Sequence, residues 1–312
     1  MYNLSNALTL LRNPQALPGV YHQFGMTLNQ RYYKWRGHSD HGSIMDESWD
    51  NLFLLDGCRY DLFKSTIDLD GTLEPRISVG SSSNDFLTST FTGEQYHDTV
   101  YVTANPYFTE IPDETFYTTI NLLDDGWDVE LETVPPDVMA DAIRDAHKEY
   151  PQKRILAHFM QPHYPFIGEF GQQLPQGGIS PPSEKGGEGE SNGDIWVKLQ
   201  FRLDGVTKSD VWRGYRENLE RVVNEVEQLI LDLDGQTVLS SDHGNLIGDW
   251  IGPVPCRGYG HPPQIYADSL VRVPWFVIPG QRREVVAETP VSTTDLDEDI
   301  VSDRLNQLGY IA

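Results

Sequence analysis

The chain has 312 residues, enough to bury the core of one large α/β domain. Asp and Glu number 47 against 23 Lys and Arg, which gives a formal net charge of −24. This composition offers no basic stripe to neutralise phosphates, so we expect no nucleic-acid partner. Acid spread along the whole chain together with scarce lysine is typical of a surface adapted to high salt, as in halophiles. An ordinary acidic cytosolic protein is the alternative.

Cysteine content and hydropathy indicate what kind of protein this is and in which compartment it is expected. Cys58 and Cys256 are the only cysteines, so a disulfide framework is not expected. The first residues have neither a basic flank nor an apolar core and do not resemble a secretory signal. No run of about 18 apolar residues occurs, so no membrane span is expected. The sequence therefore predicts a soluble protein of the cytoplasm.

The predicted elements alternate between strands and helices. Residues 1–48 are mixed and polar and are predicted as an N-terminal arm with a short helix near 4–11. Residues 49–312 are predicted as one domain, with a mobile insertion at 168–200 because 168–194 is dense in Gly, Pro, Ser and Glu. Strands are predicted at 49–56, 99–103, 154–159, 237–240 and 273–278, and helices at 84–90, 136–150, 211–231 and 299–308. This order predicts an α/β fold with a mostly parallel sheet and helices on both faces.

Two of these strands end in acidic residues. Asp56 follows four apolar residues, and Asp242 and His243 follow the strand at 237–240. Open α/β sheets bind their ligands at the carboxyl ends of the strands. Carboxylates beside a neutral imidazole are suited to a divalent cation. Taken alone, an Asp-His-Gly turn is equally consistent with a structural turn.

The two motifs together resemble those of the alkaline phosphatase superfamily, and within it the sulfatase-like hydrolases and phosphoglycerol transferases. One motif is Leu-Leu-Asp-Gly-Cys-Arg-Tyr-Asp at 54–61, and the other is Ser-Asp-His-Gly at 241–244. The resemblance covers most of residues 49–280. It implies the fold of that superfamily and an enzyme that acts on phosphate or sulfate esters.

The resemblance also implies a nucleophile between the two motifs. In the sulfatase and phosphodiesterase patterns, the nucleophile stands ten positions before the Gly of a Thr-Gly pair, which places it at Ser83 ahead of Gly93. A serine at a helix N-terminus would lie among free N–H groups that stabilise an anion. Ser81 and Ser82 are the fallback positions. Capping of the helix by Ser83 or Asn84 is the structural alternative.

Two histidines and an arginine complete the set of candidates. By the resemblance, His163 would contact the anionic group of the substrate or protonate the leaving oxygen, and His261 would bind the substrate. Arg59 would clamp an anion, or would pair with Asp61 and fix the turn. His158 is predicted as a core residue inside its strand.

The sequence departs from the family pattern in ways that bear on cofactors. The formylglycine signature Cys-x-Pro-x-Arg is absent, which disfavours sulfatase chemistry of that type. The places of a second metal's ligands hold His163 and Ile167, so a second ion is not expected. One divalent ion, Mn, Zn, Mg or Ca, would be held by four side chains, namely Asp56, Ser83, Asp242 and His243.

The sequence thus predicts a metal-dependent, sulfatase-like hydrolase or transferase that uses a serine nucleophile. Its substrate would be an anionic ester, with a sugar or lipid precursor as the candidate class. Phosphoryl transfer is favoured over sulfuryl transfer, because an unmodified serine is a poor route to the release of sulfate. The alternative is a catalytically inactive member of the same fold that binds an anion or a glycan.

Overall fold

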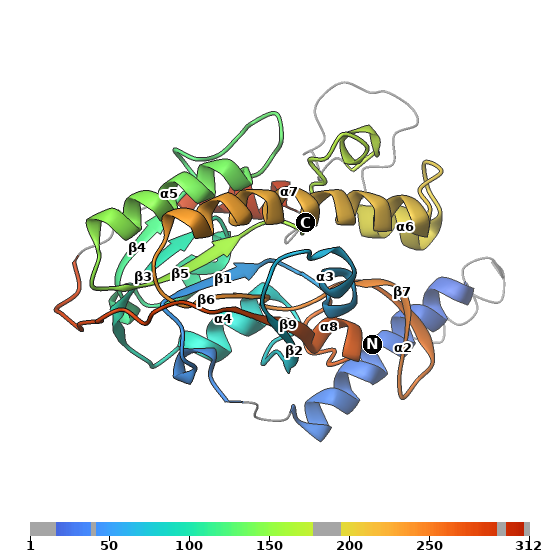
Figure 1. Ribbon diagram of the computed structural model, residues 1–312. Helices are drawn as coiled ribbons and strands as arrows, with labels where there is room; N and C mark the ends of the chain where they lie inside the picture. Colours follow the sequence, from blue (N-terminus) through green and yellow to red (C-terminus); the bar gives the residue numbers. More distant parts are fainter. Residues whose placement is uncertain (1–16, 39–41, 177–194, 292–297, 309–312) are drawn as a thin grey trace.

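The computed structural model describes residues 17–38, 42–176, 195–291 and 298–308, and it is built on a seven-stranded sheet (Figure 1). The strand order is β2-β9-β6-β1-β5-β3-β4. The strands are β1 (Asn51–Leu55), β2 (Thr72–Ile77), β3 (Tyr96–Thr103), β4 (Phe116–Asn121), β5 (Arg154–Phe159), β6 (Thr237–Ser240) and β9 (Arg272–Ile278). Strands β6, β1, β5, β3 and β4 run parallel, whereas β9 is antiparallel to both of its neighbours. The predicted, mostly parallel sheet is confirmed.

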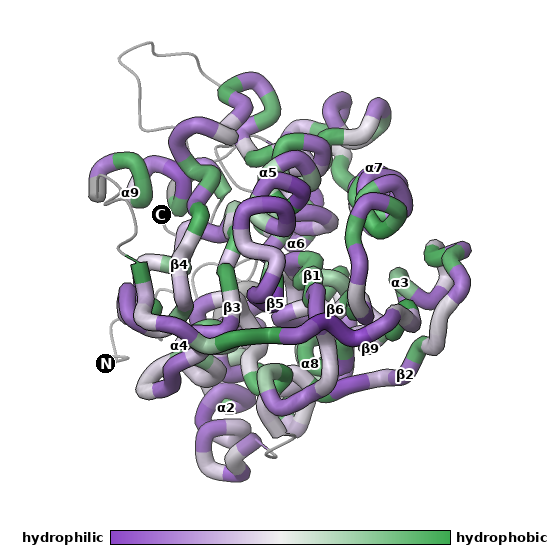
Figure 2. Tube along the Cα trace, turned by 60° about the vertical axis from the view of Figure 1, so that its left-hand side comes forward, coloured by the Kyte–Doolittle hydropathy of each residue, from purple (hydrophilic) through white to green (hydrophobic). Residues whose placement is uncertain are grey.

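Helices cover both faces of this sheet, as predicted (Figure 1). The larger helices and the α8 turn are α2 (Leu17–Arg36), α3 (Tyr60–Thr66), α4 (Ser83–Phe91), α5 (Pro136–Glu149), α6 (Ile195–Phe201), α7 (Lys208–Asp232), α8 (Asp268–Val271) and α9 (Glu298–Gln307). Four short 3₁₀ turns lie at Ile44–Asp46, Pro106–Glu110, Asp113–Thr115 and Gly171–Gln173. Hydrophobic and hydrophilic residues alternate along α7 (Figure 2), as expected for a helix that packs one face on a core.

The central strand β1 is buried on both sides, which fixes its position in the middle of the molecule. Phe53 and Leu55 belong to the core formed with α5 and α7, whereas Leu52 and Leu54 belong to the core formed with α4. A parallel strand covered on both faces has no polar side chains until it ends. The first polar side chain after β1, that of Asp56, therefore marks the carboxyl edge of the sheet.

Several elements were not predicted from the sequence. Strand β2 contains Pro75, which is tolerated because β2 lies at the edge of the sheet. A separate hairpin, β7 (Leu246–Ile251) with β8 (Cys256–Gly260), forms despite several Gly and Pro residues. Strand β4 and the 20-residue helix α2 were also unexpected, the latter in the segment predicted as an arm.

The predicted helix near 4–11 lies wholly outside the described residues. The insertion predicted at 168–200 lies partly outside them, at residues 177–194. The described flanks of that insertion contain the 3₁₀ turn Gly171–Gln173 and helix α6. Within the described part of the chain, no helix is both long and apolar enough to cross a membrane.

Candidate metal and catalytic site

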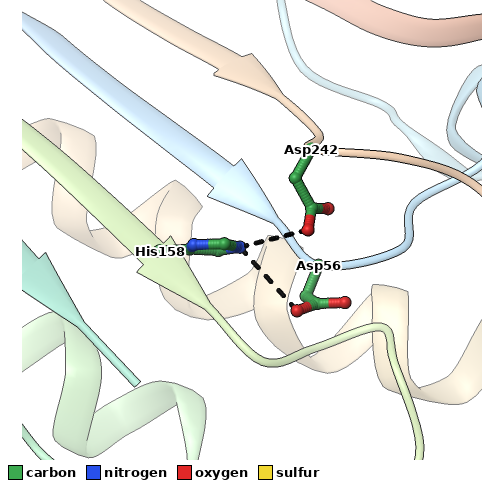
Figure 3. A group of neighbouring side chains, drawn as sticks. All are labelled: Asp56, His158 and Asp242. Carbon is green, nitrogen blue, oxygen red and sulfur yellow. Dashed lines mark ion pairs between the residues drawn. The ribbon is translucent and has the colours of Figure 1, made fainter. Parts of the chain in front are cut away.

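Three buried side chains converge where the parallel strands β6, β1 and β5 end (Figure 3). Asp56 directly follows β1, Asp242 follows β6, and His158 is the penultimate residue of β5. Atom Nε2 of His158 lies 3.7 Å from Oδ2 of Asp56 and 3.5 Å from Oδ2 of Asp242. The three groups come together because neighbouring parallel strands end at the same edge.

Ser83 and His243 also contact these carboxylates. The Ser83 hydroxyl donates to Oδ2 of Asp56 at 3.1 Å and lies 3.2 Å from Nε2 of His243. That nitrogen lies 3.4 Å from Oδ2 of Asp242 and 3.7 Å from Oδ1 of Asp56. The structure therefore brings together the four side chains that the sequence proposed as a set.

The three serines of the serine loop, Ser81, Ser82 and Ser83 at the start of α4, make different contacts. Ser82 caps α4, because its side chain accepts from the backbone N–H of Asp85. The Ser81 hydroxyl bonds to Asp85 and to the carbonyl of Pro262. Ser83 is the first residue of the helix, and its buried hydroxyl is the one that reaches Asp56. Of the three serines, Ser83 is thus the one placed for chemistry.

Backbone geometry aims the Asp242 carboxylate. Its Oδ1 accepts from the N–H groups of Gly57 at 3.0 Å and His243 at 2.8 Å, which leaves Oδ2 toward the imidazoles. Gly57 has a φ of +64°, and a Cβ there would lie 2.7 Å from Nδ2 of Asn245, so glycine is required. Burial raises the pKa of Asp242, but the charges of His243 and His158 and the Gly57 N–H outweigh it and hold the pKa below its usual value.

Neighbouring groups orient the other members of the site. His243 Nδ1 donates to the carbonyl of Gly244 at 2.7 Å, which turns Nε2 toward the carboxylates. His158 Nδ1 lies 3.2 Å from the Tyr101 hydroxyl. The Asn105 amide donates to Oδ2 of Asp56 at 2.7 Å. Such contacts fix tautomers and ring orientations around metal ligands.

His158 and Asn105 are the members of this site that sequence reasoning missed. His158 was predicted as a core residue, and it is fully buried. Its position one residue before the end of a predicted parallel strand was the available signal, because that position shares the sheet edge with Asp56. Asn105 follows β3 by two residues, but nothing in its local sequence distinguishes it from a turn residue.

The donor set fits a divalent cation. Donors bound at about 2.1 Å to one ion lie about 3.0–3.4 Å apart, and the contacts above span 3.1 to 3.7 Å. Nε2 of His158 and Oδ2 of Asp242 are buried and form no hydrogen bond with the described residues, and such groups call for a partner. Carboxylate, hydroxyl and imidazole donors together suit Zn or Mn best.

His163 and His261 lie beside this centre, as the sequence predicted for both. His261 stacks on His243 at 4.8 Å between ring centroids and meets His163 at 4.9 Å. The hairpin β7–β8 brings His261 back to the site, directly after Gly260. Burial lowers the pKa of His163 to about 3, and its Nδ1 donates to the Tyr164 carbonyl at 2.5 Å. In this arrangement His163 is neutral near pH 7, and its Nε2 is an acceptor rather than an acid.

Arg59 forms the ion pair that the sequence left open as one of its two roles. Its guanidinium binds Asp61 through two nitrogens at 2.9 and 2.7 Å. It also donates to Asp249 at 2.9 Å and to the carbonyl of Asn245 at 2.8 Å. Burial would lower the pKa of Arg59, but the bonds and charges of Asp61 and Asp249 raise it overall. With these contacts in place, Arg59 fixes the turn, and we assign it no substrate contact.

Replacing Arg59 by Ala is expected to lower the free energy of unfolding by about 2 kcal/mol, because the buried carbonyl of Asn245 and the mostly buried carboxylate of Asp249 then lose their donor. Urea denaturation followed by circular dichroism measures this change. Arg144→Ala is the matched control, since its partners Asp141 and Asp232 are exposed, and its effect should stay below about 1 kcal/mol. Equal losses in the two variants would show that the Arg59 contacts add nothing beyond a surface pair.

A cavity of about 470 Å³ opens beside the site. Its walls include Asn84 from the first turn of α4, Tyr107, His261, and residues Trp196 and Gln200 of α6. Among the described residues that line it, none is Lys or Arg. The volume falls in the range of small-molecule pockets. The cavity thus borders His261 and the two neighbours of Ser83 in the chain, Ser82 and Asn84, whereas Ser83 itself is fully buried.

No protein-family model and no curated protein matches this chain. It is similar to the periplasmic domain of phosphoethanolamine transferase EptC from Campylobacter jejuni, with 12% identity, 73% of this chain and 78% of that chain covered, and a TM-score of 0.47. The Escherichia coli EptC domain in complex with Zn gives 12% identity, 77% and 76% coverage, and a TM-score of 0.46. A protein in the alkaline phosphatase superfamily from Vibrio parahaemolyticus has 11% identity to this chain, with 78% of this chain and 62% of that chain covered and a TM-score of 0.40. The structures similar to this chain therefore include phosphoethanolamine transferases and a protein in the alkaline phosphatase superfamily.

Proposed function

We propose that this chain is a metal-dependent hydrolase or transferase of phosphate esters, with Ser83 as the nucleophile. One observation carries the proposal: a buried serine hydroxyl at a helix N-terminus lies within 3.2 Å of both Asp56 and His243. These two residues in turn contact Asp242 and His158 at the ends of three parallel strands. The motifs at 54–61 and 241–244, which resemble those of the alkaline phosphatase superfamily, supply Asp56, Asp242 and His243.

The chain's own groups account for the attack. The oxygen of Ser83 forms a bond to phosphorus while the bond from phosphorus to one ester oxygen breaks. This leaves the phosphoryl group, with any remaining ester substituent, on Ser83 and releases an alkoxide that water protonates. Asp56 Oδ2 already accepts the Ser83 hydroxyl hydrogen bond, so it is placed to take up that proton. The first turn of α4 directs backbone N–H groups toward the oxygens that gain charge. Water or an acceptor alcohol then removes the phosphoryl group from Ser83.

The cation would be held by Asp56, Ser83, Asp242 and His243. His158, which contacts both carboxylates, would be a further ligand. A divalent ion there would supply Lewis-acid chemistry, which neutralises developing charge and favours the ionised serine. His261 and His163 lie beside His243, and their Nδ1 atoms are bonded to the Asn245 side-chain oxygen and the Tyr164 carbonyl. With both rings neutral, each Nε2 can accept a hydrogen bond from a hydroxyl group of the substrate.

The chemistry of the nucleophile favours phosphate over sulfate. Ser83 is followed by Asn84, Asp85 and Phe86, so the signature that directs conversion to formylglycine is absent. An unmodified serine forms a sulfate ester that hydrolyses poorly, whereas a phosphoserine can pass its group on. Cys58, which is buried in the turn after Asp56, donates through its thiol to the carbonyl of Arg59 and lies outside the serine loop.

Removal and return of metal tests the proposal. The protein is stripped with a chelator, dialysed, and assayed with bis-p-nitrophenyl phosphate and p-nitrophenyl sulfate after addition of Mn, Zn, Mg or Ca. We expect turnover of the phosphodiester only with added ion, and at least tenfold less turnover of the sulfate ester. Binding of an ion without turnover of either ester would favour the alternative, an inactive anion- or glycan-binding protein. Absence of both binding and turnover would refute the metal site as well.

A further inference from the structure

Helix α2 differs in charge from the rest of this acidic chain. The whole chain carries a net charge of −24, yet Leu17–Arg36 contains three basic residues, Arg31, Lys34 and Arg36, and no Asp or Glu. All three basic side chains are exposed. An exposed basic helix on an otherwise acidic protein marks a surface for an anionic partner.

The two faces of α2 have different roles. The inner face packs on the β7–β8 hairpin and its turn, where the Asn29 side chain bonds to the backbone of Val254 in both directions, at 2.9 and 2.8 Å. Phe24 and Trp35 are exposed and, with the half-buried Leu28, follow helical spacing along the outer face. Tyr21 borders this face: the residue is 54% exposed, and its hydroxyl donates to the carbonyl of Pro255 in the hairpin turn at 2.8 Å. Trp35 is 82% exposed. Large aromatic rings left in water on a helix that is already packed need a further explanation.

The exposed aromatic residues continue beyond α2 toward the cavity. Phe201 on α6 and Trp250 on β7 are also exposed. Helices α2 and α6 are neighbours, since His22 and Gln200 form a 3.1 Å hydrogen bond. Among the exposed large hydrophobic residues of the described chain, every aromatic one lies on these three elements, and we call them the aromatic surface: Tyr21, Phe24, Trp35, Phe201 and Trp250.

This surface adjoins the candidate active site. In Figure 1, α2, α6 and β7 lie at the right, the end toward which the parallel strands point. Val197 of α6 is partly exposed and also lines the 470 Å³ cavity, as Gln200 does. Phe201, the member of the aromatic surface on α6, is therefore within one helical turn of two residues that line the cavity.

We propose that the aromatic surface, together with the basic residues of α2, docks this protein on an anionic lipid bilayer. Trp, Tyr and Phe rings partition into the interface between headgroups and acyl chains, and Lys and Arg beside them bind anionic headgroups. The acidic remainder of the protein is repelled by the same bilayer, so the docked orientation is set by charge. Docking places the cavity against the lipid surface. The further step, that the substrate is an ester carried by the membrane, rests on the proposed function, whereas the docking does not.

Flotation with vesicles tests the docking without any catalysis. The full chain is mixed with vesicles of phosphatidylglycerol and phosphatidylcholine in equal parts, or of phosphatidylcholine alone. We expect preferential flotation with the anionic vesicles, weakened but not abolished by high salt, because salt screens the charges and not the rings. The double variant Phe24→Ser/Trp35→Ser should lower the partition coefficient about tenfold or more.

Leu231→Ser is the matched control, because Leu231 is 77% exposed on α7, outside the aromatic surface. This variant should float as the wild type does. The proposal fails if the wild type floats with neither vesicle, or if Leu231→Ser loses as much binding as the double variant. It also fails if the wild type is a dimer that the double variant converts to a monomer in light scattering, since a second copy then covers the surface. Loss of ester turnover alone would count against the proposed function and leave the docking result unaffected.

Discussion

The variant Ser83→Ala is expected to lower kcat/KM for a phosphodiester about a thousandfold or more, which is the scale for loss of a nucleophile that acts as part of a unit. The physical reason is that, of the three serines of the serine loop, Ser83 is the one that bonds to the Asp56 carboxylate, whereas Ser82 caps α4 and Ser81 bonds to Asp85. Steady-state assays with the metal-loaded protein measure the loss.

Mass spectrometry of acid-quenched reactions checks the same prediction directly. In the wild type, the peptide that contains Ser83 should gain the phosphoryl group of the phosphodiester with its remaining ester substituent during turnover, and Ser83→Ala should show no such gain. Ser81→Ala is the matched control and should retain the modified peptide. Phosphorylation that persists in Ser83→Ala and disappears in Ser81→Ala would transfer the nucleophile to Ser81. Full activity in Ser83→Ala would contradict a covalent route.

The second large effect is expected from Asp242→Asn, which should abolish stabilisation by the metal. Ligand at a thousandfold excess over its dissociation constant stabilises a folded protein by about 4 kcal/mol. For a chain of this size that corresponds to a rise in Tm of about 8 °C in the wild type. Asn at position 242 keeps the size of the side chain but removes the charge that Oδ2 would present to the ion. Thermal unfolding with and without Zn or Mn measures both shifts.

Asp268→Asn provides the control for that measurement, because Asp268 is exposed and forms only a 3.8 Å contact with Arg272. It should keep the full metal-induced rise in Tm. Parallel substitutions of His158 and His243 by Asn then show which imidazole contributes more to the ion's affinity. An unchanged metal-induced shift in Asp242→Asn would exclude the proposed site.

The sequence predicted the central strands and the carboxylate positions because burial on both faces leaves a simple pattern. After Asn51, strand β1 is apolar up to its last residue, Leu55, which Asp56 follows, and the predicted strand at 237–240 coincides with β6. The elements it missed depend on contacts rather than on local pattern. The β7–β8 hairpin pairs through a register shift near Gly248, and α2 is held against this hairpin through Asn29 and Val254. Such long-range pairing leaves no periodicity in the local sequence.

The candidate site was predictable to the same extent. Asp56, Asp242 and His243 follow predicted strands, so their meeting follows from a parallel sheet. His158 has the burial of a core residue and differs only in where its ring nitrogen points, which depends on Tyr101 and the neighbouring strand ends. The role of Arg59 depended on Asp249, which lies 190 positions away on an unpredicted strand. The direction of the His158 ring and the distant partner of Arg59 therefore could not be predicted from the sequence.

The convergence of side chains at one edge of the sheet also bears on how the chain holds together. The donors come from positions 56, 83, 158, 242 and 243, so consecutive donors up to Asp242 are separated by 27, 75 and 84 residues. An ion shared by them would act as a cross-link that closes these loops, and closing long loops removes conformational entropy from the unfolded chain. The same atoms that serve the reaction would then join β1, α4, β5 and β6, much as a disulfide does in proteins that have one.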